Sequence, residues 1–486
     1  MSLSNAISNA VSGIVAASRG TEVVASNLAN ALTPGYARRE LQQSARSYLA
    51  GGGGVQVDGV ARVVRNSVLA QGRLASADAA RAGTLADFHK SMADALGVPG
   101  QPGALTTLLS EFEAALVSAS ARPENESGLA RALSAASALA GAYQSIGNSI
   151  QQARTTADQA IAQDVATLNS GLEQVAELNR QIAMQTTAGG DANALQDERQ
   201  RLIDQLAEIV PLKELPRENG RVALFTANGG VLLDGTEPAR FGFTAAGPVT
   251  AGMAVGASAL GLLSLNGQEI PAAQMGRYAG GRLAANFQIR DVDAPLAQAR
   301  LDAAALDLHD RFADSAVDPT LGASDPGLYT DAGALVLPPP APGLAQRLTL
   351  NPALDPAVGG DIWRLRDGLG ATAPGPAGAS GLLVAMKDAL GASRAGTLPG
   401  LSARPRTAAV LASELTSLAA SGRIDAERVL GAAAVQSSTY ASLLQQDGVD
   451  SDKEMETLLA LERAYASNAR VLQAVDEMIQ TILRLT

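Results

Sequence analysis

Two histidines and a few closely spaced acids are the residues of this sequence that could serve metal or acid–base chemistry. His89 and His309 lie in helix-like stretches, and neither begins the H-E-x-x-H pattern with which a helix presents two zinc ligands. Glu111 and Glu113 are two positions apart, so a helix points them to different faces and they cannot act as an acid–base pair. The sequence also lacks cysteine, a G-x-S-x-G nucleophile motif and a Walker-type phosphate loop. We therefore predict no catalytic residue, no metal site, no cofactor and no enzymatic activity.

The composition favours helices and argues against two kinds of partner. Hydrophobic residues make up 47% of the chain but aromatic residues only 3%, so the apolar content is mostly alanine, leucine and valine, which suit close helix packing. The net charge is −11 without a basic stripe, which argues against nucleic acid. No stretch reaches the roughly 20 apolar residues of a membrane span, and no cleavable signal is expected at the start. At 486 residues, about two to four domains are expected.

Both ends of the chain carry small or apolar residues at alternating steps of three and four. That spacing is typical of a coiled-coil seam. Each predicted helix is too polar on its other side to be buried alone, so we expect the two seams to meet each other or to meet neighbouring copies. Two unrelated amphipathic helices on one globular surface would show the same periodicity. The predicted assembly-interface residues are Leu3, Ile7, Ile14, Val24, Leu28, Leu458, Leu461, Tyr465, Leu472 and Ile479.

A turn motif follows the first predicted helix. Asparagine tolerates the left-handed conformation at a helix end, and a Pro-Gly pair fits the middle of a type II turn. The motif residues are Asn27, Asn30, Pro34, Gly35 and Tyr36. The sequence therefore predicts a firm helix end followed by a chain reversal.

The middle of the chain reads as helical, with one small β region. Helical periodicity predicts a rod over 127–184, roughly 80–90 Å long at about 1.5 Å per residue. A hairpin pattern lies within 211–280, and a proline-, glycine- and alanine-rich stretch at 313–381 predicts loop with little regular structure. Asp450 or Ser451 is the expected N-cap of the last helix.

The expected fold is mainly α, with the terminal helices forming a coiled-coil-like inner domain, an elongated helical-bundle middle and a small β-rich part. The predicted divisions are a terminal assembly domain (1–36 with 448–486), an elongated helical domain (37–210 with 281–312 and 382–447), a β-rich region (211–280) and a reduced insert (313–381).

Sequence motifs at both ends resemble the rod, hook and hook-associated axial proteins of the bacterial flagellum. At the start these are SGIVAA (12–17), SNLAN (26–30) and TPGYAR (33–38). At the end they are GVD (448–450), EM (454–455), LL (458–459), RAY (463–465), NARVL (468–472) and DEM (476–478). Hook and rod proteins are mostly β between their terminal helices. The long helical middle and ALQDERQRLIDQL (194–206) are similar to the hook-associated branch, whose members join hook to filament.

The resemblance implies a structural subunit that forms a ring at the junction between hook and filament. Its implied partners are copies of itself, the hook protein, the second junction protein and a cytoplasmic export chaperone that holds the C-terminal seam. It implies export through the flagellar apparatus without a cleaved signal, to an extracellular place in the flagellum. Disorder of the terminal helices is expected outside the assembly. Two alternatives stay open: a hook or distal rod subunit of the same family, and an enzyme such as a cell-wall hydrolase on an axial scaffold.

Overall fold

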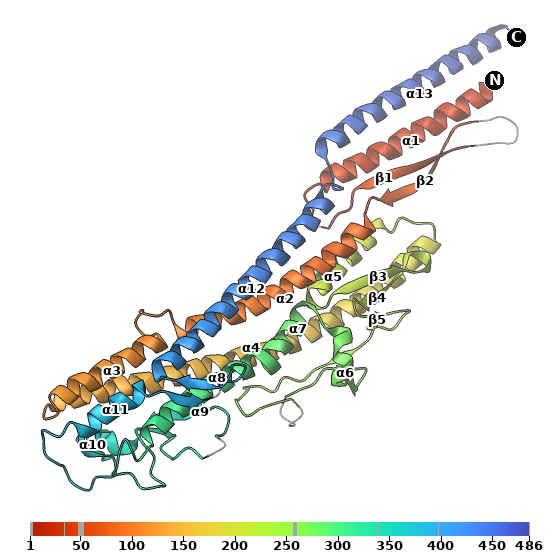
Figure 1. Ribbon diagram of the computed structural model, residues 1–486. Helices are drawn as coiled ribbons and strands as arrows, with labels where there is room; N and C mark the ends of the chain where they lie inside the picture. Colours follow the sequence, from red (N-terminus) through yellow and green to blue (C-terminus); the bar gives the residue numbers. More distant parts are fainter. Residues whose placement is uncertain are drawn as a thin grey trace.

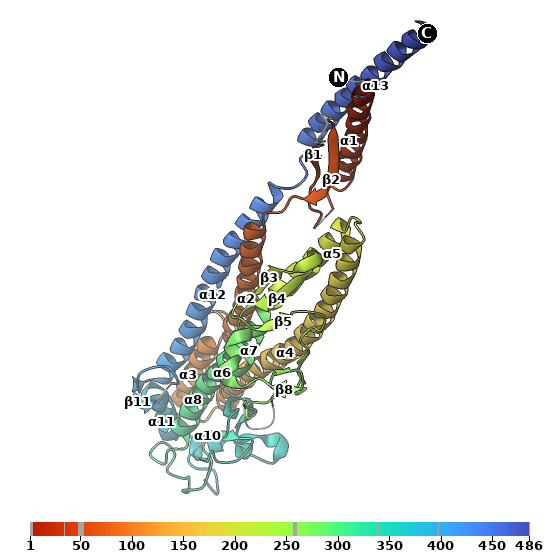
Figure 2. The ribbon, with the colours of Figure 1, turned by 90° about the vertical axis from the view of Figure 1, so that its right-hand side faces the viewer.

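The protein is a long helical body from which a thinner unit, made of the first and last helices, projects at one end (Figure 1). The computed structural model describes residues 3–33, 35–46, 53–255, 260–337, 340–396 and 398–485. The two chain ends lie together at the tip of the projecting unit, and a view turned by 90° shows the same arrangement (Figure 2). The predicted fold class, mainly α with a small β region, is confirmed.

The projecting terminal unit contains two helices and one hairpin. Helix α1 spans Leu3–Ala29 and α13 spans Ser451–Leu485. Strands β1 (Arg39–Ala45) and β2 (Val55–Arg62) pair antiparallel with a register shift after Gln42, and the hairpin lies alongside α1. The predicted helices at both ends of the chain are therefore present.

The body is built around one long helix, α4 (Glu126–Thr187), which corresponds to the rod predicted over 127–184. Asn125 caps α4 by accepting the backbone N–H of Ser127 at 3.1 Å. The other long body helices are α2 (Asn66–Leu96), α3 (Leu105–Ala121), α5 (Asn193–Ile209), α8 (Ala294–Phe312) and α12 (Ala408–Gln445). Helix α12 lies along α2 and leads toward the terminal unit (Figure 1).

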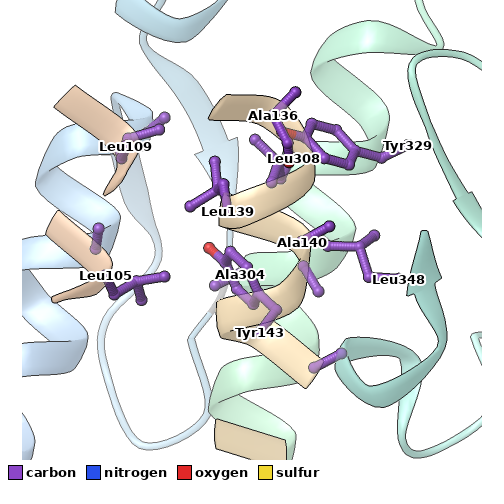
Figure 3. Close-up of a cluster of buried hydrophobic side chains, with 14 of the residues drawn as sticks. Leu105, Leu109, Ala136, Leu139, Ala140, Tyr143, Ala304, Leu308, Tyr329 and Leu348 are labelled. Atoms are coloured by element: carbon purple, nitrogen blue, oxygen red, sulfur yellow. The ribbon is translucent and has the colours of Figure 1, made fainter. Parts of the chain in front are cut away.

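The main core surrounds the first half of α4. Figure 3 shows Leu139 and Tyr143 of α4 between Leu105 and Leu109 of α3 on one side and Leu308 of α8 on the other. Leucine and alanine dominate this core, as the low aromatic content requires, and the small side chains let the helices approach closely. Helix α11 (Gly381–Gly391) packs against α3 at the same end of the body.

A second core joins the β region to the far half of α4. Strands β3 (Leu212–Pro216), β4 (Val222–Thr226) and β5 (Val231–Leu233) form an antiparallel sheet, which confirms the predicted hairpin. Three two-residue strands make a second sheet: β6 (Phe241–Gly242), β7 (Ser264–Leu265) and β8 (Gln268–Glu269). Short helix α6 (Ala272–Met275) and η2 (Gly276–Tyr278) lead to α7 (Gly281–Gln288), whose Leu283 is buried in this core.

The 313–381 segment is more ordered than its composition predicts. It contains β9 (Tyr329–Asp331), α9 (Leu344–Arg347), β10 (Leu348–Leu350) and α10 (Arg364–Asp367), with the 3-10 turns η4 (Pro352–Leu354) and η5 (Pro356–Val358). Leu328, Tyr329 and Leu348 are fully buried, and the Tyr329 hydroxyl donates to the carbonyl of Ala136 in α4 at 3.2 Å. The expectation of loop with little regular structure missed this packing, because elements of three or four residues carry no measurable periodicity.

A further hairpin went unpredicted after α11. Strands β11 (Arg394–Gly396) and β12 (Arg404–Arg406) pair antiparallel just before α12. Arginine and proline dominate these strands, so their sequence has none of the alternating apolar pattern that indicates a strand. Fully buried Arg311 of α8 holds the region together by donating to the carbonyls of Ala389, at 2.6 Å, and Arg406, at 2.9 Å.

Asp450 is the N-cap of α13, which decides between the two predicted candidates. Its Oδ1 accepts the backbone N–H groups of Asp452 at 3.1 Å and Lys453 at 3.3 Å. These hydrogen bonds hold the pKa of Asp450 below its ordinary value, and the bond from the Lys453 backbone N–H has the largest effect. The cap is therefore at full strength above the ordinary carboxyl pKa and is lost as the pH falls through the lowered folded-state value.

We expect Asp450→Ala to fray the first turn of α13 at neutral pH and to remove the acid dependence of that turn. Backbone carbon chemical shifts of residues 451–454, followed from neutral to acid pH, measure both effects. Asp452→Ala is the matched control, because Asp452 is exposed in the same turn and its carboxylate caps nothing. An unchanged acid transition in Asp450→Ala would contradict the assignment.

Candidate functional site

Helices α1 and α13 lie against each other as an antiparallel pair. Gly13 faces the side chain of Asn468, and Gly20 faces Leu461. Nearer the body, Asn27 Nδ2 donates to Glu454 Oε2 at 3.1 Å. The contacts move toward the start of α13 as they move along α1, which fixes the antiparallel direction. The two predicted seams therefore meet each other within one chain.

The seam on α1 consists of small residues. Ala10, Ala17 and Val24 are buried at heptad spacing. Between them a Cβ added to Gly13 would lie 2.6 Å from Asn468 Nδ2, and a Cβ added to Gly20 would lie 2.8 Å from Leu461 Cδ2. Both positions therefore need glycine for this close approach.

The predicted interface residues divide between contact and exposure. Val24 is buried, and Leu3, Ile7, Ile14, Leu458, Leu461, Leu472 and Ile479 are half-buried. Leu28 and Tyr465 are exposed, so they are not part of the contact between α1 and α13. The prediction missed Gly13, Gly20, Asn27 and Glu454 as seam residues, since a search for apolar stripes passes over glycine and polar residues. A stripe of small residues at 10, 13, 17, 20, 24 and 27 was the available signal.

Apolar side chains remain exposed on both helices beside the seam. They include Val11, Val15, Leu28, Met455, Leu459, Tyr465, Val471 and Met478, each between 39% and 51% exposed. So many large apolar groups on one narrow unit are unusual for a surface that faces only water. The structure does not show the expected disorder of the ends, because each terminal helix shields the seam of the other. The apolar area that stays uncovered is the set of exposed side chains named above.

The turn motif ties the end of α1 to the hairpin. The carboxamide of Asn27 uses its full bonding capacity. Its Nδ2 donates to Arg39 O at 2.9 Å and to Glu454 Oε2 at 3.1 Å. Its Oδ1 accepts from Tyr36 Oη and from Arg39 N, both at 2.9 Å. Asn30 Nδ2 donates to the Ser26 carbonyl within the last turn of the helix. Gly35 has a φ of 80°, and Tyr36 N donates to Thr33 O at 3.2 Å, as in a type II turn. Pro34 lies outside the described residues.

A polar joint connects the terminal unit to the body. Asp197 of α5 accepts from Arg62 Nε at 2.7 Å, and Arg39 Nη2 lies 3.6 Å from its other oxygen. Arg65 forms an ion pair with Asp447 and donates to the carbonyl of Leu443 at 2.6 Å. The joint thus rests on arginine–carboxylate contacts, whose directional bonds hold orientation better than an apolar patch does.

The residues first considered for chemistry lie on three different helices, α2, α3 and α8. His309 is buried in α8 with Nδ1 3.0 Å from Asp310 Oδ1, and His89 lies in α2. Glu111 and Glu113 are exposed on either side of buried Phe112. Within the part of the chain that the structure describes, no three histidine or acidic side chains gather as metal ligands do. Nor does any described helix combine the length and apolar character needed to cross a membrane.

Models of three protein families match successive parts of the chain. Residues 7–36 match the flagella basal body rod protein model, and 442–485 match the C-terminal model of the flagellar basal body rod FlgEFG proteins. These segments contain the two helices of the terminal unit, which are thus similar to the corresponding ends of flagellar axial proteins. Residues 91–316 match the helical domain of the flagellar hook-associated protein FlgK. Among the axial proteins, the body of the chain is therefore similar to the flagellar hook-associated protein 1 (FlgK) family.

Individual relatives agree with the family models. The chain is similar to flagellar hook-associated protein 1 of Salmonella typhimurium (26% identical over 245 residues, 48% of this chain and 43% of the relative) and of Bacillus subtilis (30% over 222 residues, 43% and 44%). The matched regions span less than half the length of these relatives. The flagellar hook junction protein FlgK from Burkholderia pseudomallei gives a structural match with a TM-score of 0.43 and 19% identity, covering 55% of this chain and 47% of that one.

Proposed function

We propose that this chain is a structural subunit of the bacterial flagellum that forms the junction between hook and filament, and that it self-assembles through its terminal helices. The observation that carries the proposal is the paired α1 and α13, which project from the body and expose an uncovered set of apolar side chains. Similarity to the FlgK helical domain and to flagellar hook-associated protein 1 supports the place in the flagellum.

Assembly follows from the burial of this exposed set between subunits. Each large apolar side chain that leaves water contributes in proportion to its buried area, at about 25 cal/mol per Å². The pair alone is narrow and can cover only its seam, so a neighbour's terminal unit is the natural cover for Val15 or Met478. The ten predicted interface residues remain part of the proposal, with Leu28 and Tyr465 assigned to contacts between subunits.

The proposed partners are those that the resemblance to flagellar axial proteins implies. They are copies of this chain in a ring, the hook protein, the second junction protein and a cytoplasmic chaperone that covers α13 before export without a cleaved signal. We propose no enzymatic activity, no nucleic acid and no membrane partner. The four-part division predicted above (1–36 with 448–486, 37–210 with 281–312 and 382–447, 211–280, and 313–381) is kept as the domain proposal, except that the β1–β2 hairpin, which lies alongside α1, is assigned to the terminal unit.

A hook or distal rod subunit is the alternative within the same family. The helical body around α4 and the match of 91–316 to the FlgK helical domain favour the junction subunit over this alternative. Labelling with an antibody against the body discriminates the two: signal only at the boundary of hook and filament supports the junction, and signal along the hook or rod supports the alternative.

Val15→Asp tests the proposed outer surface. Val15 is 51% exposed on α1, so the charge should leave the single chain folded while it places an unpaired carboxylate in the subunit contact. We expect incorporation into flagella, in a strain that lacks its own copy of the gene, to fall by about tenfold or more. Swimming in soft agar and the amount of protein in sheared flagella measure the loss.

Val117→Asp provides the matched control for that experiment. Val117 is similarly exposed, at 48%, but lies on α3 in the body, far from the terminal unit. It should swim normally. Equal incorporation of Val15→Asp and Val117→Asp would contradict the proposed role of the exposed apolar side chains of the terminal unit.

A further inference from the structure

The seam between α1 and α13 does not fix its own register by apolar packing. Ala10, Ala17 and Val24 recur at heptad spacing on α1. Leu458, Leu472 and Ile479 are half-buried on α13 and lie at multiples of the same spacing. A slip by one heptad therefore brings small residues opposite large ones again, and the apolar contacts are rebuilt.

The two close glycine contacts specify the register only in part. A slip in one direction puts Gly20 opposite Asn468, and a slip in the other puts Gly13 opposite Leu461. Both combinations repeat a fit that the observed seam already uses, since Gly13 receives Asn468 and Gly20 receives Leu461. Each slip thus keeps one glycine contact and loses the other, because Leu461 would face Asn27 in one direction and Asn468 would face Ala6 in the other.

One buried polar contact differs between these registers. Asn27 is 1% exposed and Glu454 is 5% exposed, and their side chains are joined at 3.1 Å. The Glu454 carboxylate also lies 3.8 Å from Arg38 Nη1. After a slip, Asn27 would face Leu461 in one direction, and Glu454 would face Gly20 in the other. Either slip separates the amide from the carboxylate and leaves buried polar atoms without partners, which is strongly unfavourable.

We propose that Asn27 and Glu454 are the register-determining residues of the terminal helix pair. Asn27 suits this role because its remaining bonds go to the backbone of Arg39 and to Tyr36, so the turn holds its carboxamide in one orientation. A single buried polar contact that selects one register among several apolar ones is an established device in coiled coils. The inference concerns pairing within one chain and does not depend on the proposed place in the flagellum.

The absence of cysteine from the sequence makes disulfide trapping a direct test in the full-length chain. Gly13→Cys with Asn468→Cys reports the observed register. Gly20→Cys with Asn468→Cys, and Gly13→Cys with Leu461→Cys, report the two slipped registers. Each pair is made in the parent chain and together with Asn27→Leu and Glu454→Leu, and the rate of intramolecular disulfide formation is measured on non-reducing gels.

We expect the observed-register pair to close at least about tenfold faster than either slipped pair in the parent, and that preference to fall below about threefold when both polar residues are leucine. Asn30→Leu with Glu456→Leu is the matched control and should keep the preference, because the Asn30 side chain bonds locally to Ser26 and Thr33 rather than to α13, and Glu456 is exposed. An unchanged preference in the double-leucine chain overturns the proposal. A uniform loss of all three disulfides in the double-leucine chain also overturns the proposal, because it would show that the Asn27–Glu454 contact stabilises the helix pair without selecting its register.

Discussion

Leu472→Asp should abolish incorporation into the flagellum and leave the helical body folded. Leu472 is half-buried on the face of α13 that meets α1, so the substitution removes apolar contact and places a carboxylate in a partly buried position. The combined loss of burial and cost of desolvation is about 2–4 kcal/mol for the helix pair. That loss exceeds what a narrow two-helix unit can absorb, since few other contacts support it.

The body should not respond to this change. The terminal unit joins it through arginine–carboxylate contacts at Asp197 and Asp447, and neither core cluster includes residues of α1 or α13. We therefore expect the thermal unfolding of the body to keep its midpoint, while helical signal from the ends is lost and swimming stops. Circular dichroism of the purified chain and a soft-agar assay measure the two effects.

Gln473→Asp is the control for Leu472→Asp. It adds the same charge at the neighbouring position, where the side chain is exposed. It should assemble and swim normally. Normal swimming in Leu472→Asp would refute the role of the terminal helices, whereas loss of the body's unfolding transition would show that the two parts are not independent.

Long periodic elements were predictable from the sequence, and short ones were not. Helix α4 was found nearly to its ends because its buried positions, such as Ile161, Leu168 and Leu172, repeat over many turns. The ordered segment around Tyr329 was not predicted, because its burial depends on Ala136 and other residues that are distant in sequence. Local pattern cannot encode such long-range contact.

The candidate site shows the same limit at the level of single residues. The apolar stripes correctly indicated two helices with seams, and Val24 is buried as predicted. The closest contacts, however, use Gly13 and Gly20, which no hydrophobic pattern selects. The Asn27–Glu454 contact joins residues at opposite ends of the sequence, and only the fold brings them together.

Buried charges in the body were also beyond prediction. Asp158 of α4 and Arg290 are fully buried and form an ion pair at 2.8 Å. Arg290 lies in η3, the π-helical turn Ile289–Asp293 between α7 and α8, and its guanidinium lies over the ring of Phe287 at 5.0 Å. The second oxygen of Asp158 accepts the backbone N–H of Ala246 at 2.7 Å. One carboxylate therefore anchors both η3 and the loop after β6 to α4.

Asp158→Ala should destabilise the body by about 3–5 kcal/mol, because it leaves a buried guanidinium short of one partner and a buried N–H without an acceptor. Chemical denaturation followed by circular dichroism measures the loss. Asp425→Ala is the control: it removes an aspartate that faces Arg428 at 3.5 Å on the exposed surface of α12, and we expect a change of about 0–1 kcal/mol.

The double substitution Asp158→Leu with Arg290→Met shows whether the charge itself causes the loss. Removing both partners eliminates the unpaired buried charge and keeps most of the volume filled, so we expect it to cost clearly less than Asp158→Ala alone. If the double variant were as unstable as the single one, the bond to the Ala246 backbone, rather than the ion pair, would be the main anchor. The ion pair would then matter mainly for the orientation of η3 against α4.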